Sequence, residues 1–331
     1  MRTLIIAEAG VNHNGNLEQA KSLCLAAQRS GADVVKFQTW KTENIITKTV
    51  SMADYQKTNT GIVQSQFEML KSLELSYEDF FSIKKYCDEI DIQFASTADD
   101  EESLDFIISL GVPFIKVGSG DIGNISYLRY IGSKKLPVIL STGMSTLSDV
   151  ERSVFALKEG GVEDITLLHC TTNYPCPYNE VNLRSMLTLK HAFGLPVGYS
   201  DHTIGTEIPI SAVALGACVI EKHFTIDRNM SGPDHLASTE PKLFKIMVDS
   251  IRNVEVALGS GLKGPSVSEG NIAKVVKKRI VAKHEIPYGK IIDENDVCVK
   301  RNNTGLPADA WNLVIGIKAR KNYVQDEGIE F

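Results

Sequence analysis

The sequence predicts an α/β fold made of a (β/α)8 TIM barrel over residues 1–260, a linker over 261–278 and a small β-rich domain over 279–331. The first reason is that short apolar runs alternate eight times with segments of helical spacing, which matches a barrel of about 250 residues. The second is that nearly every apolar run ends in polar side chains. The third is that the alternation stops at a Gly- and Ser-rich stretch, 259–266, which is typical of a linker.

Each expected element follows from its local pattern. Strands are short apolar runs, and helices show apolar residues three and four positions apart. An open, doubly wound sheet is the alternative, but eight regular units favour closure. The expected strands are 4–7, 34–37, 92–95, 114–117, 138–140, 165–168, 195–199 and 218–220, and the expected helices are 17–30, 77–90, 101–110, 125–133, 147–159, 183–193, 207–216 and 241–258.

Two regions depart from this alternation. A long polar insertion over 41–66 interrupts the second unit, and loops of this length are usually functional or mobile. After a short connection of helical character at 269–278, the tail contains apolar pieces at 280–282, 297–299 and 314–317. Its roughly 50 residues are near the lower limit for an independent core, so we expect it to dock onto a barrel.

Composition and charge exclude several classes of protein. The net charge is −6 with no basic run, which argues against nucleic acid as a partner. No apolar stretch approaches the roughly 20 residues of a membrane span, and an acid at position 8 argues against a signal peptide. The six cysteines are scattered without CxxC spacing, so we expect reduced thiols, a cytoplasmic protein and no cysteine zinc site.

The polar residues at the strand ends would share one mouth of a barrel. Two lysines, several hydroxyls and Gly-flanked amides suit a phosphate or carboxylate. His202 and His223 end neighbouring strands, which lie about 4.8 Å apart, so both imidazoles could reach one metal ion. Taken singly, each residue is more often a helix cap or an ion-pair partner, but the set is harder to dismiss. It comprises Glu8, Lys36, Gln38, Thr97, Lys116, Ser119, Asp121, Ser141, Thr171, Tyr174, Ser200, His202, Glu221 and His223.

Seven segments together resemble the signatures of the sialic acid synthase family, whose members are phosphoenolpyruvate-dependent synthases of nine-carbon 2-keto acids. The resemblance covers nearly the whole chain, and the tail resembles the family's antifreeze-like (SAF) domain. Within the family, the chain is most similar to the legionaminic acid synthases. The segments are AEAGVNHNG at 7–15, VKFQT at 35–39, LSTGM at 140–144, LHCT at 168–171, YSDHT at 199–203, EKHFT at 221–225 and GPDH at 232–235.

The resemblance implies a role for each matching residue. Phosphoenolpyruvate would bind to Lys36, Thr97, Lys116, Ser119, Ser141 and Ser200. A divalent metal ion, Mn²⁺ or Mg²⁺, would bind to His202 and His223, while Glu8 and Asp121 would act in catalysis with Lys36 and Lys116. Gln38, Tyr174 and Asp234 would contact an N-acyl-amino sugar. Arg301 would come from the tail of a partner chain, because the family forms domain-swapped homodimers.

Three departures from the family pattern bear on where the sugar lies. Residues 96–99 read Ser-Thr-Ala-Asp instead of Ser-Thr-Pro-Phe, Asp121 replaces a glutamate, and Asn302 replaces a proline. The expected sugar is 2,4-diacetamido-2,4,6-trideoxymannose or N-acetylmannosamine, which would give legionaminic or N-acetylneuraminic acid. The segment 55–60 also resembles some bacterial N-acetylneuraminate synthases, and a pseudaminic acid synthase is the alternative.

Three other functions compete with this interpretation. A Schiff-base aldolase of the same fold would use Lys36, Lys116 or Lys222 as its nucleophile. A metal-dependent hydrolase would usually show more ligands than the two strong histidine candidates. A non-catalytic sugar-binding protein would not need polar residues at nearly every strand end.

Overall fold

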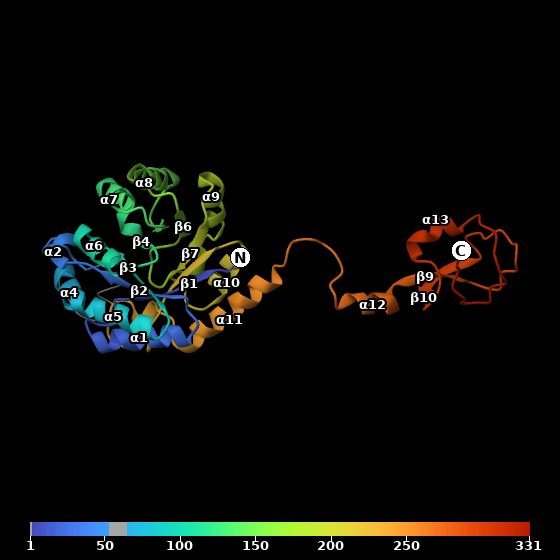
Figure 1. The fold of residues 1–331 in the computed structure, drawn as a ribbon, viewed down its shortest axis with the longest axis horizontal. Coiled ribbons are helices and arrows are strands. Elements are labelled where there is room, and N and C mark those ends of the chain that lie inside the picture. The colour runs from blue at the N-terminus through green and yellow to red at the C-terminus, as the bar shows by residue number, and fades with distance from the viewer. Residues whose placement is uncertain (1, 53–64) are drawn as a thin grey trace. The chain divides into compact units, whose positions relative to one another are not determined.

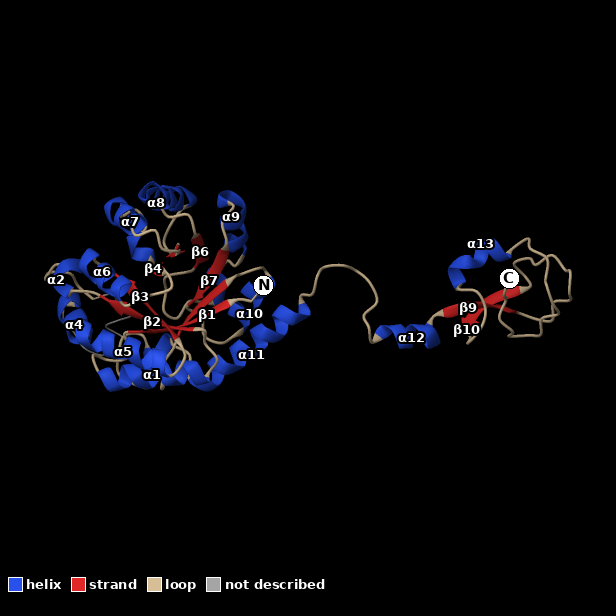
Figure 2. Ribbon diagram, viewed as in Figure 1, coloured by secondary structure: helices blue, strands red, loops and turns tan. Residues whose placement is uncertain are grey.

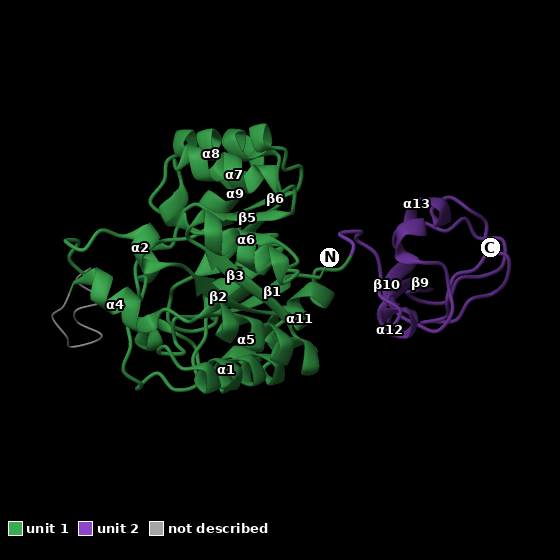
Figure 3. Ribbon diagram, turned by 60° about the vertical axis from the view of Figure 1, so that its left-hand side comes forward, with its two compact units in different colours: residues 1–259 green, residues 260–331 purple. Residues whose placement is uncertain are grey.

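The computed structural model describes residues 2–52 and 65–331 of the chain. It divides into two compact units, residues 1–259 and residues 260–331 (Figure 3). The predicted linker, 261–278, falls in the second unit and contains helix α12, Glu269–Val276. Among the described helices, none is long and apolar enough to cross a membrane.

The first unit is a closed barrel of eight parallel strands in sequence order, with β1 paired to both β2 and β8. Helices surround the strands on the outside (Figures 1 and 2). The predicted barrel is therefore confirmed. The strands are β1 Leu4–Gly10, β2 Val34–Thr39, β3 Gln93–Ala98, β4 Ile115–Val117, β5 Val138–Ser141, β6 Ile165–His169, β7 Val197–Asp201 and β8 Val219–His223.

Four helices of the barrel, α1, α5, α6 and α8, begin at a residue whose side chain caps the helix. Asn16 accepts a hydrogen bond from the backbone of Gln19 at the start of α1, and Ser76 and Thr146 form capping boxes at the starts of α5 and α8. Gly161 ends α8 in the left-handed conformation that favours glycine. The helices are α1 Leu17–Arg29, α5 Tyr77–Glu89, α6 Glu101–Ser109, α7 Ile125–Ser133, α8 Leu147–Gly160, α9 Arg184–Phe193, α10 Glu207–Ala214 and α11 Pro241–Ala257.

The insertion after β2 contains two helices that the sequence reading missed, α2 Thr42–Ile45 and α4 Gln66–Leu73. A capping box between Ser65 and Glu68 starts α4, and Met69 and Leu73 bury its inner face. The segment 55–60, which resembles other synthases, lies outside the described residues.

The barrel interior is layered, because side chains alternate between the two faces of each strand. An apolar layer comes first, formed by Ile6, Val34, Ala95, Phe114, Ile139, Leu168 and Val219. Two residues further along the strands, the next inward-facing positions hold Glu8, Lys36, Thr97, Lys116, Ser141, Cys170, Ser200 and Glu221. The apolar layer thus forms the floor on which these polar side chains stand.

The second unit has its own core, formed by residues such as Ile280, Ile292, Val314, Tyr323 and Ile329. Its regular strands in the described chain are β9 Lys278–Ala282 and β10 Val297–Arg301, which pair antiparallel. The third predicted apolar piece, 314–317, begins at the last residue of the short helix α13, Trp311–Val314.

Candidate active site

A cavity of about 180 Å³ opens at the carboxyl ends of the strands, above the apolar layer. Every residue that the sequence assigned to the site lines this cavity except Asp121, Asp234 and Arg301. The lining also includes residues that the assignment lacked: Asp99, Gly118, Gly120, Met144, Cys170, Thr172 and Glu221.

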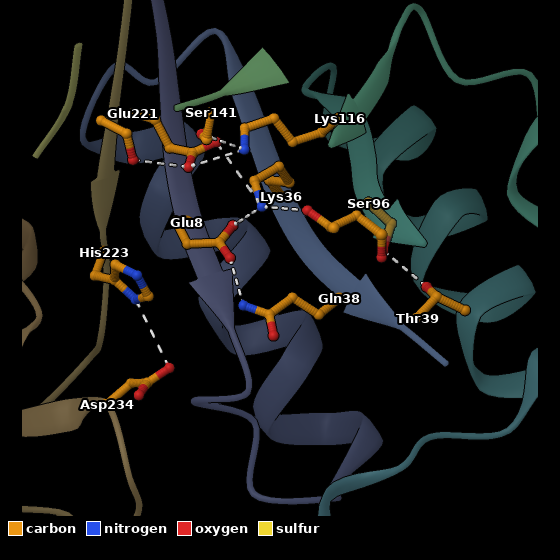
Figure 4. Close-up of polar contacts among 12 residues, drawn as sticks. Glu8, Lys36, Gln38, Thr39, Ser96, Lys116, Ser141, Glu221, His223 and Asp234 are labelled. Atoms are coloured by element: carbon orange, nitrogen blue, oxygen red, sulfur yellow. Dashed lines mark hydrogen bonds and ion pairs between the residues drawn. The ribbon is translucent and has the colours of Figure 1, made fainter. Parts of the chain in front are cut away.

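Two buried lysines and two buried glutamates form the base of the cavity (Figure 4). Lys36 Nζ lies 2.7 Å from Glu8 Oε2 and 3.8 Å from Glu221 Oε2. Lys116 Nζ lies 3.6 Å from Glu221 Oε1 and donates a hydrogen bond of 2.8 Å to Ser141 Oγ. Lys36 Nζ likewise donates a hydrogen bond of 2.9 Å to Thr97 Oγ1, so each of the two lysines contacts a hydroxyl group at the end of a strand.

The two glutamates have opposite pKa shifts. Burial raises the pKa of Glu8, although Lys36 partly opposes this effect. Burial also acts on Glu221, but Lys116 and Lys36 together outweigh it and lower the pKa of Glu221 to about 2. Glu221 therefore stays ionised, whereas Glu8 is the carboxyl that accepts a proton more readily. Two carboxyls with separated pKa values in one cavity are typical of acid–base chemistry.

The loop after β4 and the loop after β5 are joined by a hydrogen bond between Gly143 and Ser119. Ser119 Oγ accepts a hydrogen bond of 2.9 Å from the backbone of Gly143 and lies 3.3 Å from Cys170 Sγ. A Cβ at Gly143 would lie only 2.2 Å from Thr172 Oγ1 and 2.8 Å from Ser119 Oγ, so a side chain has no room there. At Gly120, which also lines the cavity, no atom lies within 4 Å of such a Cβ.

His202 and His223 lie together above this polar layer. Their ring centroids are 5.5 Å apart, and the ring of Tyr174 lies 4.2 Å from that of His202. The Nδ1 of His202 is 2.6 Å from the carbonyl oxygen of Thr171, so Nδ1 carries the proton and Nε2 has a free lone pair. Burial lowers the pKa of both imidazoles, which keeps them neutral.

These two imidazoles fit a divalent metal ion. A metal ligand must be unprotonated, as both rings are, and the buried Nδ1 of His223 has no hydrogen-bond partner among the described residues. Asp234 Oδ2 is 3.9 Å from that nitrogen. The described chain contains no group of three or more His, Cys, Asp or Glu residues placed to hold a metal. Water or substrate oxygens would therefore complete the coordination, as in metal sites that act on substrates.

Of the other assigned residues, Gln38 lines the cavity, whereas Asp121 and Arg301 do not. Gln38 Nε2 donates a hydrogen bond of 2.8 Å to Glu8 Oε1. Asp121 lies in a 3-10 turn, Ser119–Asp121, and accepts a hydrogen bond from Asn124 at 3.1 Å. The burial of Asp99 and, after it, the negative charge of Asp121 raise the pKa of Asp99 to about 7. Arg301 belongs to the second unit, where it is exposed at the end of β10.

The sequence placed Glu221 at the barrel mouth without giving it a role, and it gave Asp99 no role in the site, although a signal for each was present. Glu221 faces the barrel interior on β8 as Glu8 does on β1, because the strand register pairs Ile6 with Glu221 and Glu8 with His223. Asp99 follows Thr97 by two residues just past the end of β3. Counting alternate positions from the known strand ends would have found both residues.

Known proteins match this chain over nearly its whole length. The NeuB family profile matches residues 23–263, and the SAF domain profile matches residues 278–330. The chain is 48% identical over 326 residues to the N,N'-diacetyllegionaminic acid synthase of Legionella pneumophila, covering 97% of this chain and 92% of that protein. It is 47% identical over 328 residues to the synthase of the same name from Campylobacter jejuni, covering 98% of both chains.

A solved structure and a more distant relative extend the comparison. The crystal structure of N-acetylneuraminic acid synthetase from Leptospira borgpetersenii, in complex with citrate, superposes with a TM-score of 0.73 at 33% identity, covering 83% of this chain and 91% of that chain. The pseudaminic acid synthase of Campylobacter jejuni is 31% identical over 321 residues, covering 97% of this chain and 93% of that protein. From the matched profiles and these identities, the chain belongs to the NeuB family and ends in a SAF domain.

Proposed function

We propose that this chain is a synthase that condenses phosphoenolpyruvate with an N-acyl-amino hexose to a nine-carbon 2-keto acid, with release of phosphate. The observation that carries this proposal is one cavity with two buried lysines at its base and two neutral imidazoles above them. The preferred sugar is 2,4-diacetamido-2,4,6-trideoxymannose, and the product is N,N'-diacetyllegionaminic acid. The 48% identity to a synthase of that name supports this choice over pseudaminic acid, whose synthase is 31% identical.

The base of the cavity suits the anion. Phosphoenolpyruvate carries a phosphate and a carboxylate, and Lys36 and Lys116 each lie within reach of hydroxyl groups that would share those oxygens. An anion there would meet the amino groups of Lys36 and Lys116 beside the carboxyl groups of Glu8 and Glu221. Burial raises the pKa of Glu8, which weakens the repulsion between this carboxyl group and an anion. Lys36 and Lys116 would also stabilise the charge on the departing phosphate.

The imidazoles would hold the sugar above the anion. His202 and His223 would hold a divalent ion, Mn²⁺ or Mg²⁺, which supplies Lewis-acid polarisation of the sugar aldehyde when bound. Tyr174 and Asp234 lie close to these rings, and Gln38 is bonded to Glu8 in the same cavity; these three residues would contact the acyl-amino groups.

The reaction then balances in three steps. The methylene carbon of phosphoenolpyruvate forms a bond to the aldehyde carbon, whose oxygen takes a proton from Glu8 or Asp121. Water adds to the carbon that bears the phosphate, which became positively charged when the carbon–carbon bond formed, and releases a proton. The carbon–oxygen bond of the tetrahedral intermediate to phosphate then breaks while its new hydroxyl group gives its proton to the departing phosphate, which leaves the 2-keto acid.

We also propose that the chain works in the cytoplasm as a homodimer in which Arg301 of one protomer reaches the sugar in the active site of the other. Arg301 is exposed, and among the described residues its guanidinium has no hydrogen bond or ion pair. A guanidinium offers several directed donors to sugar oxygens. The six cysteines are free, which supports a reducing compartment.

A sugar panel tests the proposed function. Purified protein with Mn²⁺ and phosphoenolpyruvate should receive 2,4-diacetamido-2,4,6-trideoxymannose, N-acetylmannosamine or the hexose precursor of pseudaminic acid, and both phosphate and 2-keto acid should be measured. We expect the highest kcat/KM with the diacetamido mannose. A clear preference for another sugar would overturn the substrate assignment, and no phosphate release with any sugar would overturn the function.

A further inference from the structure

A buried ion pair lies between the ends of β7 and β8, on the side of these strands that faces away from the cavity. Lys222 Nζ donates a hydrogen bond to Asp201 Oδ2, and the two side chains are 1% and 0% exposed. The two residues are direct cross-strand partners. Neither is among the described residues that line the cavity, so Lys222 is also poorly placed for the Schiff base considered from the sequence.

Side chains alternate between the two faces of a strand, so the residues directly before and directly after this ion pair on β7 and β8 face the cavity. On one side, Ser200 Oγ donates to Glu221 Oε1 at 3.1 Å. On the other side are His202 and His223, each directly following one member of the ion pair. A shift of one strand against the other at the ion pair would therefore change the separation of the two imidazoles.

The same pair also holds the backbone beyond His202. Lys222 Nζ donates to the carbonyl oxygen of Thr203 at 2.8 Å. Asp201 Oδ1 accepts from the backbone nitrogen of Thr203 at 3.0 Å and from its hydroxyl at 2.8 Å. The residues before and after His202 are thus both bound within one network. The ring of His202 is then oriented by Thr171, as described above.

Stability alone does not explain two charges at this place. The outward-facing positions of the barrel strands are otherwise mostly apolar, for example Ile5, Val35 and Leu167, and they pack in the main core. A buried ion pair usually stabilises a fold no better than apolar residues of similar size, because removing both charges from water offsets their attraction. The ion pair instead fixes the relative position of β7 and β8, because its hydrogen bonds form only when the two strands lie at one position against each other.

We propose that Asp201 and Lys222 are positioning residues that hold His202 and His223 at the separation required for one shared divalent ion. The inference rests on the proposed function, because that function places the ion on these two histidines. Residues that orient metal ligands from outside the coordination shell typically change metal affinity by about 10- to 100-fold.

Titration of the whole protein with Mn²⁺, by isothermal calorimetry, tests this role without relying on turnover. Lys222→Met should lower Tm, because it leaves the carboxylate of Asp201 buried without its partner. The double variant Asp201→Leu/Lys222→Met removes both charges and should recover much of the lost Tm. Its Mn²⁺ dissociation constant should still be about 10- to 100-fold higher than that of the wild type. Its kcat should fall, with little change in KM for phosphoenolpyruvate.

Two further variants separate positioning from general stability. Asp201→Asn/Lys222→Gln keeps a directed hydrogen bond without charge and should recover most of the Mn²⁺ affinity. As a matched control, Asp33→Leu/Arg252→Met removes an ion pair of 2.7 Å at the opposite end of the barrel. This control should lower Tm and leave Mn²⁺ affinity unchanged.

The outcomes distinguish this inference from the function on which it rests. If the apolar double variant binds Mn²⁺ as tightly as the wild type, the pair is only structural and the positioning role is overturned, while the proposed function stands. If Asp201→Leu/Lys222→Met and the control Asp33→Leu/Arg252→Met lose Mn²⁺ affinity in proportion to their loss of Tm, the lost affinity reflects stability. That result would also overturn the positioning role. Absence of Mn²⁺ binding by the wild type would overturn the metal site and this inference together.

Discussion

Lys116→Met removes one of the two positive charges from the base of the cavity and keeps most of the aliphatic side chain. In the structure, Lys116 Nζ donates to Ser141 Oγ at 2.8 Å and to the carbonyl oxygen of Val117 at 3.1 Å, and it lies 3.6 Å from Glu221. The side chain is only 3% exposed, so water cannot replace it as a donor to a bound anion. The substitution therefore tests whether this lysine binds phosphoenolpyruvate.

The expected effect follows from the strength of a charged hydrogen bond. Such a bond contributes about 1.5–3 kcal/mol, and each 1.4 kcal/mol corresponds to about a tenfold change in affinity. We therefore expect KM for phosphoenolpyruvate to rise by about 10- to 100-fold and the rate to fall. Burial lowers the pKa of Lys116, which means that its charge is disfavoured in the free protein. Glu221 also keeps Lys36 as a partner at 3.8 Å, so Tm should change little.

Phosphate release at varied phosphoenolpyruvate and saturating sugar measures both parameters, and Mn²⁺ titration should show unchanged metal affinity. Lys134→Met is the matched control, because Lys134 pairs with Asp105 on the outer helices and not with the cavity. The control should behave as the wild type. If Lys116→Met also retains the wild-type KM and rate, the assignment of the anion pocket is refuted.

Three further predictions concern other parts of the account. Gly143→Ala should raise KM for phosphoenolpyruvate because its Cβ has no room, whereas Gly120→Ala should not; equal effects in steady-state assays would contradict the crowded loop. The pKa of Asp99 is raised to about 7 in the folded protein, so between pH 4 and pH 7 this carboxyl keeps its proton when the chain is folded and loses it when the chain unfolds. Asp99 therefore destabilises the protein increasingly as the pH rises from 4 to 7. Asp99→Asn should thus raise the free energy of unfolding by about 4 kcal/mol more at pH 8 than at pH 4, because the pKa of Asp99 is raised from 3.8 to about 7 and each unit corresponds to about 1.4 kcal/mol; urea melts that show no difference would refute this sign. Mixing His202→Ala with Arg301→Ala protein should restore some activity, because one hybrid site receives both native residues; mixed dimers without recovery would show that Arg301 does not act across the dimer.

Much of the fold and the site followed from alternation along the strands. Once the apolar runs were identified, the residues at their ends had to face one mouth, which brought Lys36, Lys116, His202 and His223 together. The same periodicity separates Lys222 from Glu221, since neighbouring residues in a strand face opposite sides. Treating Lys222 as a third candidate nucleophile ignored that periodicity.

Other features depend on contacts that local sequence does not specify. Asp234 reaches His223 because the segment after β8 is held to the loop after β1, where Asn12 donates to the carbonyl of Phe224 at 2.9 Å and Asn14 to that of Ser231 at 2.9 Å. These partners are more than 200 residues apart in the chain. By contrast, helix α4 was missed although a local capping signal marks its start.

In the proposed reaction, carbon–carbon bond formation precedes loss of phosphate by cleavage of the carbon–oxygen bond. Phosphoenolpyruvate labelled with oxygen-18 at its bridging oxygen tests this order, with mass analysis of the phosphate and the 2-keto acid formed with the diacetamido mannose. We expect one labelled phosphate for each nine-carbon product and no phosphate without sugar. Unlabelled phosphate, phosphate release without sugar, or inactivation by borohydride through an imine would contradict the proposed reaction.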